Sequence, residues 1–381
     1  MSASANRAEE GIALMLVLVF IVLLSAIVVE YTYEAQVEAS LSEASQSDFE
    51  AYLAAKSAIA SGLALLHADL IGEDAVASGL ESLSAMGLGN PDVGVSQDFD
   101  SLQDIWVQGV PGQMINEAMM QCSIDDECAK LNLNSIFTMM VEEGEEAEQA
   151  EQTEEPDPIL EEALRYLFAT FEVEEDPVDA ILDWLDVDED PRPLGAESDY
   201  YASLETPYPC KNGPMDSIEE LLLIRGITPD LYFDCNRNLE DTSAVEEVEP
   251  LSLTDLLAVH QDMSGQKARI NVNTARPEVL EAFFGALNAG NVAAVDLILD
   301  TRLDEPFTSK EDLAGRGILN RDDEADQAGW EMLDVRSTIF RVTGDAWAND
   351  TMVRVQAYVW RVPPEVAADE TFRLLDWRVI R

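Results

Sequence analysis

The chain has 381 residues and carries 76 acidic against 22 basic side chains, which gives a formal net charge of −54 at pH 7. Such a charge repels a nucleic-acid backbone and an anionic membrane surface, so neither is expected as a broad partner, whereas divalent cations are attracted. The length leaves room for two or three domains of ordinary size.

The first predicted element is a membrane-spanning helix over residues 12–29. Its sequence, IALMLVLVFIVLLSAIVV, has no charged residue and follows a short polar leader that ends at Gly11. As a helix it is about 27 Å long, close to the ~30 Å hydrocarbon core of a bilayer. A secretory signal peptide would have a shorter apolar region, a basic stretch before it and an A-x-A-like cleavage site, and these features are absent.

The same helix is predicted to continue to about Leu70. No Gly interrupts the chain between Gly11 and Gly62, and no Pro occurs before residue 91. Over the outer half, apolar residues such as Tyr52 and Ile59 recur at helical spacing, so this stretch needs a partner surface. An ordinary membrane anchor with an unrelated stalk is the alternative.

The leader, the glycine, the apolar helix and its amphipathic extension resemble the class III prepilin signal of type IV pilins and type II secretion pseudopilins. The resemblance implies that a membrane prepilin peptidase removes residues 1–11 by cutting between Gly11 and Ile12. The fifth residue of the mature chain would be Leu16. Most pilin-like proteins have glutamate there, and its absence is typical of the K-type minor pseudopilin.

Beyond the long helix the sequence predicts uneven structure. Residues 71–100 are expected to be loop, and a hairpin is expected from QDIWVQGV and CSIDDECAKLNLNSIF. Residues 135–157 are acidic and of low complexity, which predicts a solvated linker. Helical spacing returns in ILEEALRYLFATF and VDAILDWLD.

The strongest chemical signal is an acidic run after the second of these helices. Asp186, Asp188 and Asp190 have the spacing of the first ligands of an EF-hand, and Glu197 falls at the twelfth position. Pro191 replaces the glycine of that loop, so the backbone path must differ. Oxygen ligands favour Ca²⁺ over zinc or copper. A chance cluster on a solvated face is the alternative.

This run also resembles K-type minor pseudopilins, over residues 183–201 and again over 212–232. The family carries calcium in its helical domain. By resemblance, calcium is therefore expected at a set of five carboxylates with two possible helpers. The five are Asp186, Asp188, Asp190, Glu197 and Asp199, and the helpers are Asn212 and Asp216.

Two segments, IEELLLIRGI and the region around RINVNTARPEVLEAFFGALNAGN, resemble helix-hairpin-helix modules, which bind DNA through hairpin amides and nearby basic residues. The hairpin GALNAGN lacks a G-x-G and has acidic residues around it. We therefore predict SAM-like helical folds used for protein contact, over residues 158–250 and 251–334.

From Ser337 onward three segments alternate with period two and are rich in Val, Ile, Phe, Tyr and Trp, which predicts an antiparallel meander. The predicted fold class is thus α+β. A pilin-like core from residues 30–134 and 335–381 packs the long helix on an antiparallel sheet. A large all-α insertion, SAM-like or helix-hairpin-helix-like, interrupts it.

The four cysteines form two close pairs in the sequence, Cys122 with Cys128 and Cys210 with Cys235. Two local disulfides are favoured if the body lies outside the cytoplasm, and free thiols are the alternative. No catalytic constellation accompanies either of the two histidines, so an enzyme is not predicted.

The resemblance to K-type minor pseudopilins of type II secretion systems covers nearly the whole chain. It implies a single-pass protein of the bacterial inner membrane, with most of the chain in the periplasm. It also implies a non-enzymatic role at the tip of the pseudopilus, with the I and J minor pseudopilins and other secretion components as partners. A membrane-anchored helix-hairpin-helix receptor for DNA uptake and a type IV minor pilin are the alternatives.

Overall fold

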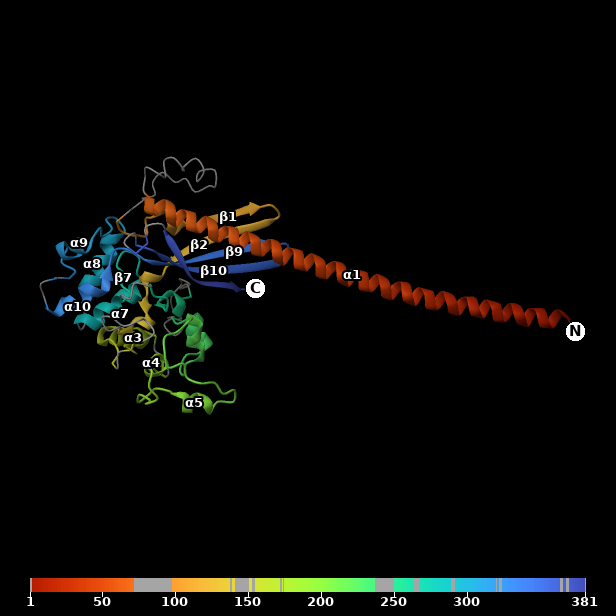
Figure 1. The fold of residues 1–381 in the computed structure, drawn as a ribbon, viewed down its shortest axis with the longest axis horizontal. Coiled ribbons are helices and arrows are strands. Elements are labelled where there is room, and N and C mark those ends of the chain that lie inside the picture. Colours follow the sequence, from red (N-terminus) through yellow and green to blue (C-terminus); the bar gives the residue numbers. More distant parts are fainter. Residues whose placement is uncertain are drawn as a thin grey trace, which may run out of the picture.

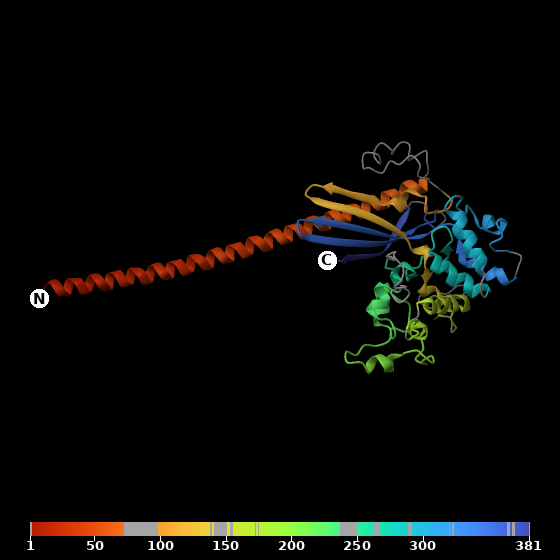
Figure 2. The ribbon, with the colours of Figure 1, turned by 180° about the vertical axis from the view of Figure 1, so that it is seen from behind.

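The computed structural model of the chain describes residues 2–71, 98–137, 139–140, 151–152, 155–171, 173, 175–236, 250–262, 267–288, 292–319, 321, 324–363, 366–367 and 370–380. Most of the predicted loop at residues 71–100 and of the linker at residues 135–157 lies outside these ranges. Figures 1 and 2 show a long helix that projects from a body made of a sheet and a group of helices.

The long helix is α1 (Ser2–Ile71), so the prediction of one uninterrupted helix to about Leu70 is confirmed. Residues 15–46 are all exposed, and burial begins at Ser47, where the helix meets the body. By length and composition α1 is able to cross a membrane. The apolar half of the helix thus points away from the body, and the amphipathic half is packed against it (Figure 1).

One five-stranded antiparallel sheet forms the other half of the core, with strand order β1-β2-β9-β10-β11. Its strands are β1 (Val110–Ile115), β2 (Ala118–Asp126), β9 (Ile339–Ala348), β10 (Thr351–Arg361) and β11 (Phe372–Ile380). The predicted C-terminal meander is confirmed as β9, β10 and β11. Strand β2 pairs with β9, so the sheet joins the two ends of the chain around the insertion.

The first strand of the hairpin begins later, and the second strand earlier, than the sequence indicated. Half of the predicted strand QDIWVQGV is a 3₁₀ turn, Ile105–Gln108, and the hairpin is formed by β1 and β2. Ile115 pairs with Ala118 across a two-residue turn in which Asn116 has a φ of 52°. Asparagine tolerates this left-handed conformation, which is the chemistry that two-residue hairpins need.

Helix α1 packs closely on the middle of the sheet. A Cβ added at Gly344 would lie 2.5 Å from the carbonyl oxygen of Ala55, and one added at Gly62 would lie 2.7 Å from the sulfur of Cys122. Around this seam α1, β2, β9 and β10 bury one hydrophobic cluster, to which Ile59, Val342 and Val355 belong. The predicted α+β class, with a long helix on an antiparallel sheet, is therefore confirmed.

The segments between β2 and β9 form a mainly helical body. Its α-helices are α3 (Pro158–Thr170), α4 (Val178–Leu185), α5 (Ser198–Ala202), α6 (Pro229–Phe233), α7 (Pro277–Asn288), α8 (Val292–Arg302), α9 (Lys310–Gly315) and α10 (Glu324–Met332). Two-residue strands also occur here: β3 (Leu131–Asn132), β4 (Met139–Met140), β5 (Glu151–Gln152), β6 (Leu257–Ala258), β7 (Ile270–Asn271) and β8 (Leu333–Asp334). The insertion is therefore not entirely α-helical.

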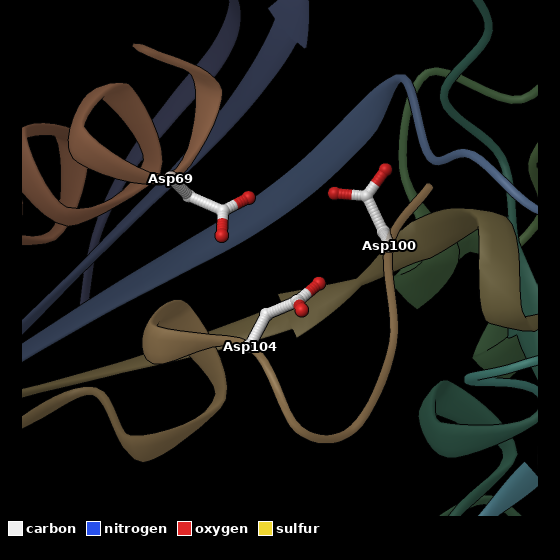
Figure 3. Close-up of side chains that lie close together, drawn as sticks. All are labelled: Asp69, Asp100 and Asp104. Carbon is white, nitrogen blue, oxygen red and sulfur yellow. The ribbon is translucent and has the colours of Figure 1, made fainter. Parts of the chain in front are cut away.

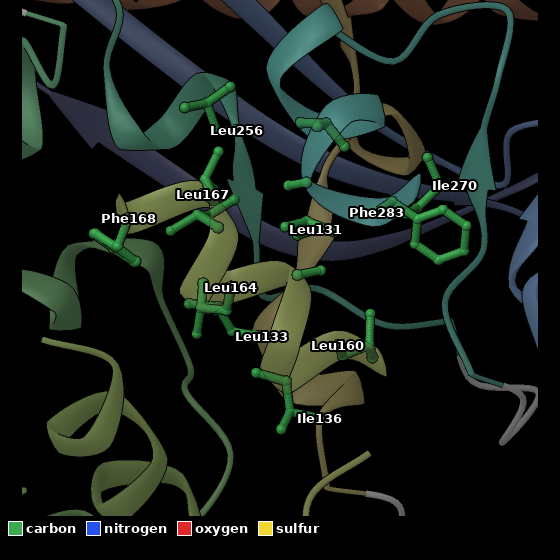
Figure 4. Packing of buried hydrophobic residues seen from close by; sticks show 14 of the residues in the cluster. Leu131, Leu133, Ile136, Leu160, Leu164, Leu167, Phe168, Leu256, Ile270 and Phe283 are labelled. Atoms are coloured by element: carbon green, nitrogen blue, oxygen red, sulfur yellow. The ribbon is translucent and has the colours of Figure 1, made fainter. Parts of the chain in front are cut away.

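The helical body has one continuous core in the described residues. Residues of α3, such as Leu164, pack with residues of α7, such as Phe283, and the same cluster includes Leu131 from β3 and Leu256 (Figure 4). The sequence predicted two separate helical domains divided near residue 250. Amphipathic spacing in α3 and α7 marked a buried face on each helix, but it did not show that the two faces meet each other.

Candidate metal centre

Helix α4 presents a line of acidic side chains to the protein interior. Asp179, Asp183 and Asp186 are separated by four and three residues, so they lie on one face of the helix. Asp183 is fully buried and Asp186 is 3% exposed. The helix ends at Leu185; the backbone N–H of Asp186, the next residue, still donates to the carbonyl oxygen of Leu182, and the chain then enters a loop.

A third buried carboxylate comes back to this face from the other end of the loop. Glu197 immediately precedes α5 and is 4% exposed. One carboxylate oxygen from each of Asp183, Asp186 and Glu197 lies within 4.8 Å of the other two. Three negative charges are thus brought together out of water, an arrangement that is costly unless cations neutralise it.

Arg192, from the middle of the loop, supplies part of the neutralising charge. Its Nη1 donates to Asp183 over 2.8 Å and also to Asp186, and its backbone N–H donates to the Asp183 carboxylate. Gly195 lets the loop close over this pair, because a Cβ there would lie 1.8 Å from an Asp183 oxygen. One guanidinium against three carboxylates leaves the cluster short of positive charge.

Several acceptor oxygens at this site have no hydrogen-bond donor among the described residues. They are Oδ1 of Asp186, both carboxylate oxygens of Glu197, and Oδ1 of Asn212 in the neighbouring loop. Burial and the nearby charges of Asp183 and Asp186 raise the pKa of Glu197 to about 8, and burial raises the pKa of Asp186 to about 6. The site therefore favours a bound cation or proton.

The donor set fits a hard divalent cation. Carboxylate and amide oxygens are the ligands that Ca²⁺ prefers, whereas zinc sites are usually built from sulfur and nitrogen. The Cys210 thiol lies beside the cluster, but burial raises its pKa to about 12, so it stays protonated. Its Sγ donates to the backbone oxygen of Asp183. The residues present fit calcium.

The structure revises the predicted ligand set. It brings Asp186 and Glu197 together, but Asp188, Asp190 and Asp199 are exposed and lie outside the buried cluster. Asp188 instead accepts from the backbone N–H of Asp190 over 2.7 Å, which stabilises the loop itself. Because Pro191 replaces the glycine of an EF-hand loop, the backbone follows another path, and the EF-hand spacing of Asp188 and Asp190 does not bring them to the cluster.

Asp183 is the member that the ligand prediction omitted. Its three-residue separation from Asp186, inside a helical pattern, was the signal that could have found it. Of the two suggested helpers, Asn212 donates to the backbone oxygen of Asp188 and so holds the loop. Asp216 pairs with Lys211 at 2.7 Å and is a surface residue.

A second group of buried carboxylates lies where the end of α1 meets the sheet. Asp69 from α1 and Asp100 and Asp104 from the loop before β1 point toward one another (Figure 3). Arg361 binds Asp100 through Nη1 at 2.9 Å and lies 3.7 Å from Asp69. Asp104 accepts from the backbone N–H and hydroxyl of Ser101. Because Arg361 and Ser101 already supply positive charge and hydrogen bonds to these carboxylates, the cluster holds the end of α1, the loop before β1 and strand β10 together.

All four cysteines are free, buried thiols in the structure, so the predicted disulfides are absent from it. Cys122 faces the seam between α1 and the sheet, whereas Cys128 packs in a separate small cluster and contacts Thr338. Cys210 donates to Asp183 and Cys235 donates to Leu251. Cys122 and Cys128 thus lie in different hydrophobic clusters, whereas Cys210 and Cys235 share one.

The predicted cleavage junction, Gly11 followed by Ile12, lies within α1. Its processing stays a prediction. His260, which has no catalytic partner in the sequence, stacks on Tyr358 with ring centroids 3.8 Å apart. Burial lowers its pKa, which is the behaviour of a packed imidazole.

Comparison with known proteins agrees with this architecture. Residues 129–238, which contain the acidic centre, match the family described as type II secretion system (T2SS), protein K. A type II secretion system protein K from Pectobacterium carotovorum subsp. carotovorum is 47% identical over 53 residues, which is 14% of this chain. That match spans 16% of the length of the Pectobacterium protein.

A chain in the crystal structure of the GspK-GspI-GspJ complex from the type 2 secretion system of enterotoxigenic Escherichia coli has a similar fold. The TM-score is 0.61, the identity is 16%, and the match covers 89% of this chain and 99% of that one. The two chains thus share an α+β fold with a long N-terminal helix, an antiparallel sheet and additional helices. Over residues 129–238 the chain matches the protein K family of type II secretion systems.

Proposed function

We propose that the chain is an assembly component at the tip of the type II secretion pseudopilus, where it works together with the I and J minor pseudopilins. It has no enzymatic role. Its apolar helix spans the bacterial inner membrane and its body lies in the periplasm. Before assembly, prepilin peptidase removes residues 1–11 by cutting between Gly11 and Ile12.

The bulk of the helical body carries this proposal. It lies beyond the sheet, around the end of α1 that is far from the N-terminus (Figure 1). In a fibre whose subunits align their long helices, a body of this size at the outer end obstructs a further subunit. A subunit with this shape suits the last position, and Leu16 in place of a charged residue suits a position with no subunit above it.

The acidic centre gives the helical body its cation dependence. Calcium, when bound to Asp183, Asp186 and Glu197, supplies the positive charge that Arg192 alone does not. The loop between α4 and α5 is then held at both ends, since Asp186 begins it and Glu197 closes it. The bound ion therefore stabilises the helical body, and its role is structural.

Two measurements test the proposal. Full-length chain, extracted from membranes of cells that also produce the I and J subunits, should recover both subunits. Gold-labelled antibody against the helical body should mark one end of isolated pseudopili. Labelling along the whole fibre would refute the tip position, and failure to recover either subunit would refute co-assembly.

A further inference from the structure

Three adjoining hollows form one furrow in the surface of the helical body. Their volumes are about 690, 460 and 70 Å³. Arg269 lines all three hollows, and Lys310 lines the two larger ones, so the three are continuous. Figure 1 shows the helices beside them, α3, α9 and α10, at the end of the body that is far from the N-terminus. Together these hollows are the basic furrow.

The furrow gathers basic side chains in a chain that has few of them. The sequence contains 22 lysine and arginine residues against 76 acidic ones. Four of the 22 line the furrow, namely Lys267, Arg269, Lys310 and Arg336. Lys267 pairs with Asp157 at 2.5 Å, and Arg269 pairs with Asp334 at 3.0 Å. Acidic side chains of the protein thus neutralise two of the four positive charges.

The other two basic side chains have no acidic partner. Neither Lys310 nor Arg336 lies within ion-pair distance of a carboxylate in the described part of the chain. Lys310 Nζ instead donates to the backbone oxygen of Trp330 over 2.9 Å. Burial lowers the pKa of Lys310, so its charged form lacks the stabilisation that a close carboxylate would supply. Two positive charges therefore face the furrow with no negative charge of the protein bound to them.

Apolar side chains lie beside these charges. Trp330 and Met332 line the hollow of 460 Å³ together with Lys310. Val366, which is 53% exposed, lines the largest hollow, where Arg336 is also found. The furrow thus offers a cation and an apolar surface side by side in both of its larger parts. A ligand that complements it carries carboxylates and apolar groups in alternation.

Shape and charge together indicate a peptide. A linear chain can fill three continuous hollows one after another, whereas a single small anion cannot. Carboxylates form strong charge-assisted hydrogen bonds with lysine and arginine. The net charge of −54 repels an acidic ligand, but salt screens charges that lie farther away than about 8 Å, so the cations of the furrow dominate inside it.

We propose that the basic furrow binds an extended peptide segment of another protein. Acidic side chains of the segment pair with Lys310 and Arg336, and its apolar side chains fill the hollow beside Trp330. The proposal concerns a surface separate from the acidic centre, because none of the carboxylates of that centre lines the furrow.

Fluorescence anisotropy of the full-length chain in detergent tests the proposal. The probe is a fluorescein-labelled peptide in which leucine and glutamate alternate, and it should bind with a Kd below about 1 mM. The same peptide with glutamine in place of glutamate should bind about tenfold more weakly or worse, because it loses the charge-assisted hydrogen bonds. Equal binding of the two peptides, or no binding of the glutamate peptide, would refute the proposal.

Substitutions place the peptide in the furrow. Arg336→Gln and Lys310→Gln should each weaken binding about tenfold. Arg276→Gln is the matched control, because Arg276 is exposed on the helical body, has no described ion-pair partner and does not line the furrow. It should leave the affinity unchanged. Since Arg336 is exposed, its substitution should also leave the melting temperature unchanged. Full affinity in both furrow variants would show that the furrow is not the site.

Two further measurements distinguish a peptide from simpler ligands. A photoreactive amino acid at Ala328, exposed in the wall of the furrow, should form an adduct with the peptide. One at Ala202, exposed on α5, should form none. Sodium acetate and inorganic phosphate at a concentration equal to the Kd of the peptide should not displace it. If either anion does, the furrow is a simple anion site and the peptide proposal is wrong.

Discussion

Calcium should stabilise the helical body through the buried carboxylates of α4 and the loop that follows it. A ligand that binds only the folded chain raises the free energy of unfolding by RT ln(1 + [L]/Kd), about 2.7 kcal/mol at a hundredfold excess over Kd. For a unit of this size that corresponds to a rise in melting temperature of roughly 5 to 10 °C. Differential scanning fluorimetry of the purified chain, with millimolar CaCl₂ or with EDTA, measures it.

The Glu197→Gln variant separates specific binding from general screening. Glutamine keeps the volume of the side chain but removes a carboxyl group that, beside Asp183 and Asp186, must hold a proton at neutral pH when no cation is bound. In EDTA the variant should therefore melt at the same temperature as the parent or higher. In calcium it should show little of the parent's increase. The variant should thus melt at or above the parent in EDTA and below it in calcium. This reversal is expected only if Glu197 contributes to a cation site.

Asp199→Asn is the matched control, because Asp199 lies two residues away, carries the same charge and is exposed. It should keep the full calcium increment. Magnesium at equal concentration measures the diffuse screening of 54 net negative charges. If Glu197→Gln keeps the calcium increment, or Asp199→Asn loses it, the assignment of the buried cluster as the calcium site is wrong.

Three further predictions concern other parts of the chain. N-terminal sequencing of membrane-extracted protein should start at Ile12, and a bulky residue at Gly11 should block processing; a start at Met1 in a cell with the peptidase would contradict this. Burial raises the pKa of Asp126 from 3.8 to about 6, so the folded chain keeps a proton that the unfolded chain releases. The free energy of unfolding should therefore fall as pH rises, by about 1 to 2 kcal/mol between pH 5 and 7.5. In chemical denaturation at several pH values, Asp126→Asn should remove this pH-dependent decrease. An equal decrease in the variant and the parent would contradict the prediction. Thiol titration should find four reactive groups in denaturant and almost none in the native chain, where burial raises the pKa of each thiol to about 12; disulfide-linked peptides would contradict it.

Local patterns predicted the core of the fold because each pattern determines one element. The absence of Gly between Gly11 and Gly62 and of Pro before residue 91 predicted α1, and period-two alternation predicted the C-terminal meander. Which buried faces meet is a tertiary property. The sequence could not show that α3 and α7 share a core, nor that Asp69 at the end of α1 meets Asp100 and Arg361.

The candidate metal centre shows the same limit at the level of single residues. The acidic run after α4 predicted a cation site, and of its predicted ligands Asp186 and Glu197 lie in the buried carboxylate cluster. Asp188 and Asp190 were suggested by EF-hand spacing and Asp199 by the family resemblance, and all three are exposed. Asp183 joins the cluster because its spacing from Asp186 puts both side chains on one face of α4. The loop can pack against Asp183 because residue 195 is glycine.

The central claim is that this chain takes part in type II secretion as an assembly component. Its most direct test is deletion of the gene from its own host, followed by measurement of type II substrates in the culture medium and in the periplasm. The account predicts that substrates accumulate in the periplasm and that the full-length chain restores their export. Unchanged export in the deletion strain would contradict it.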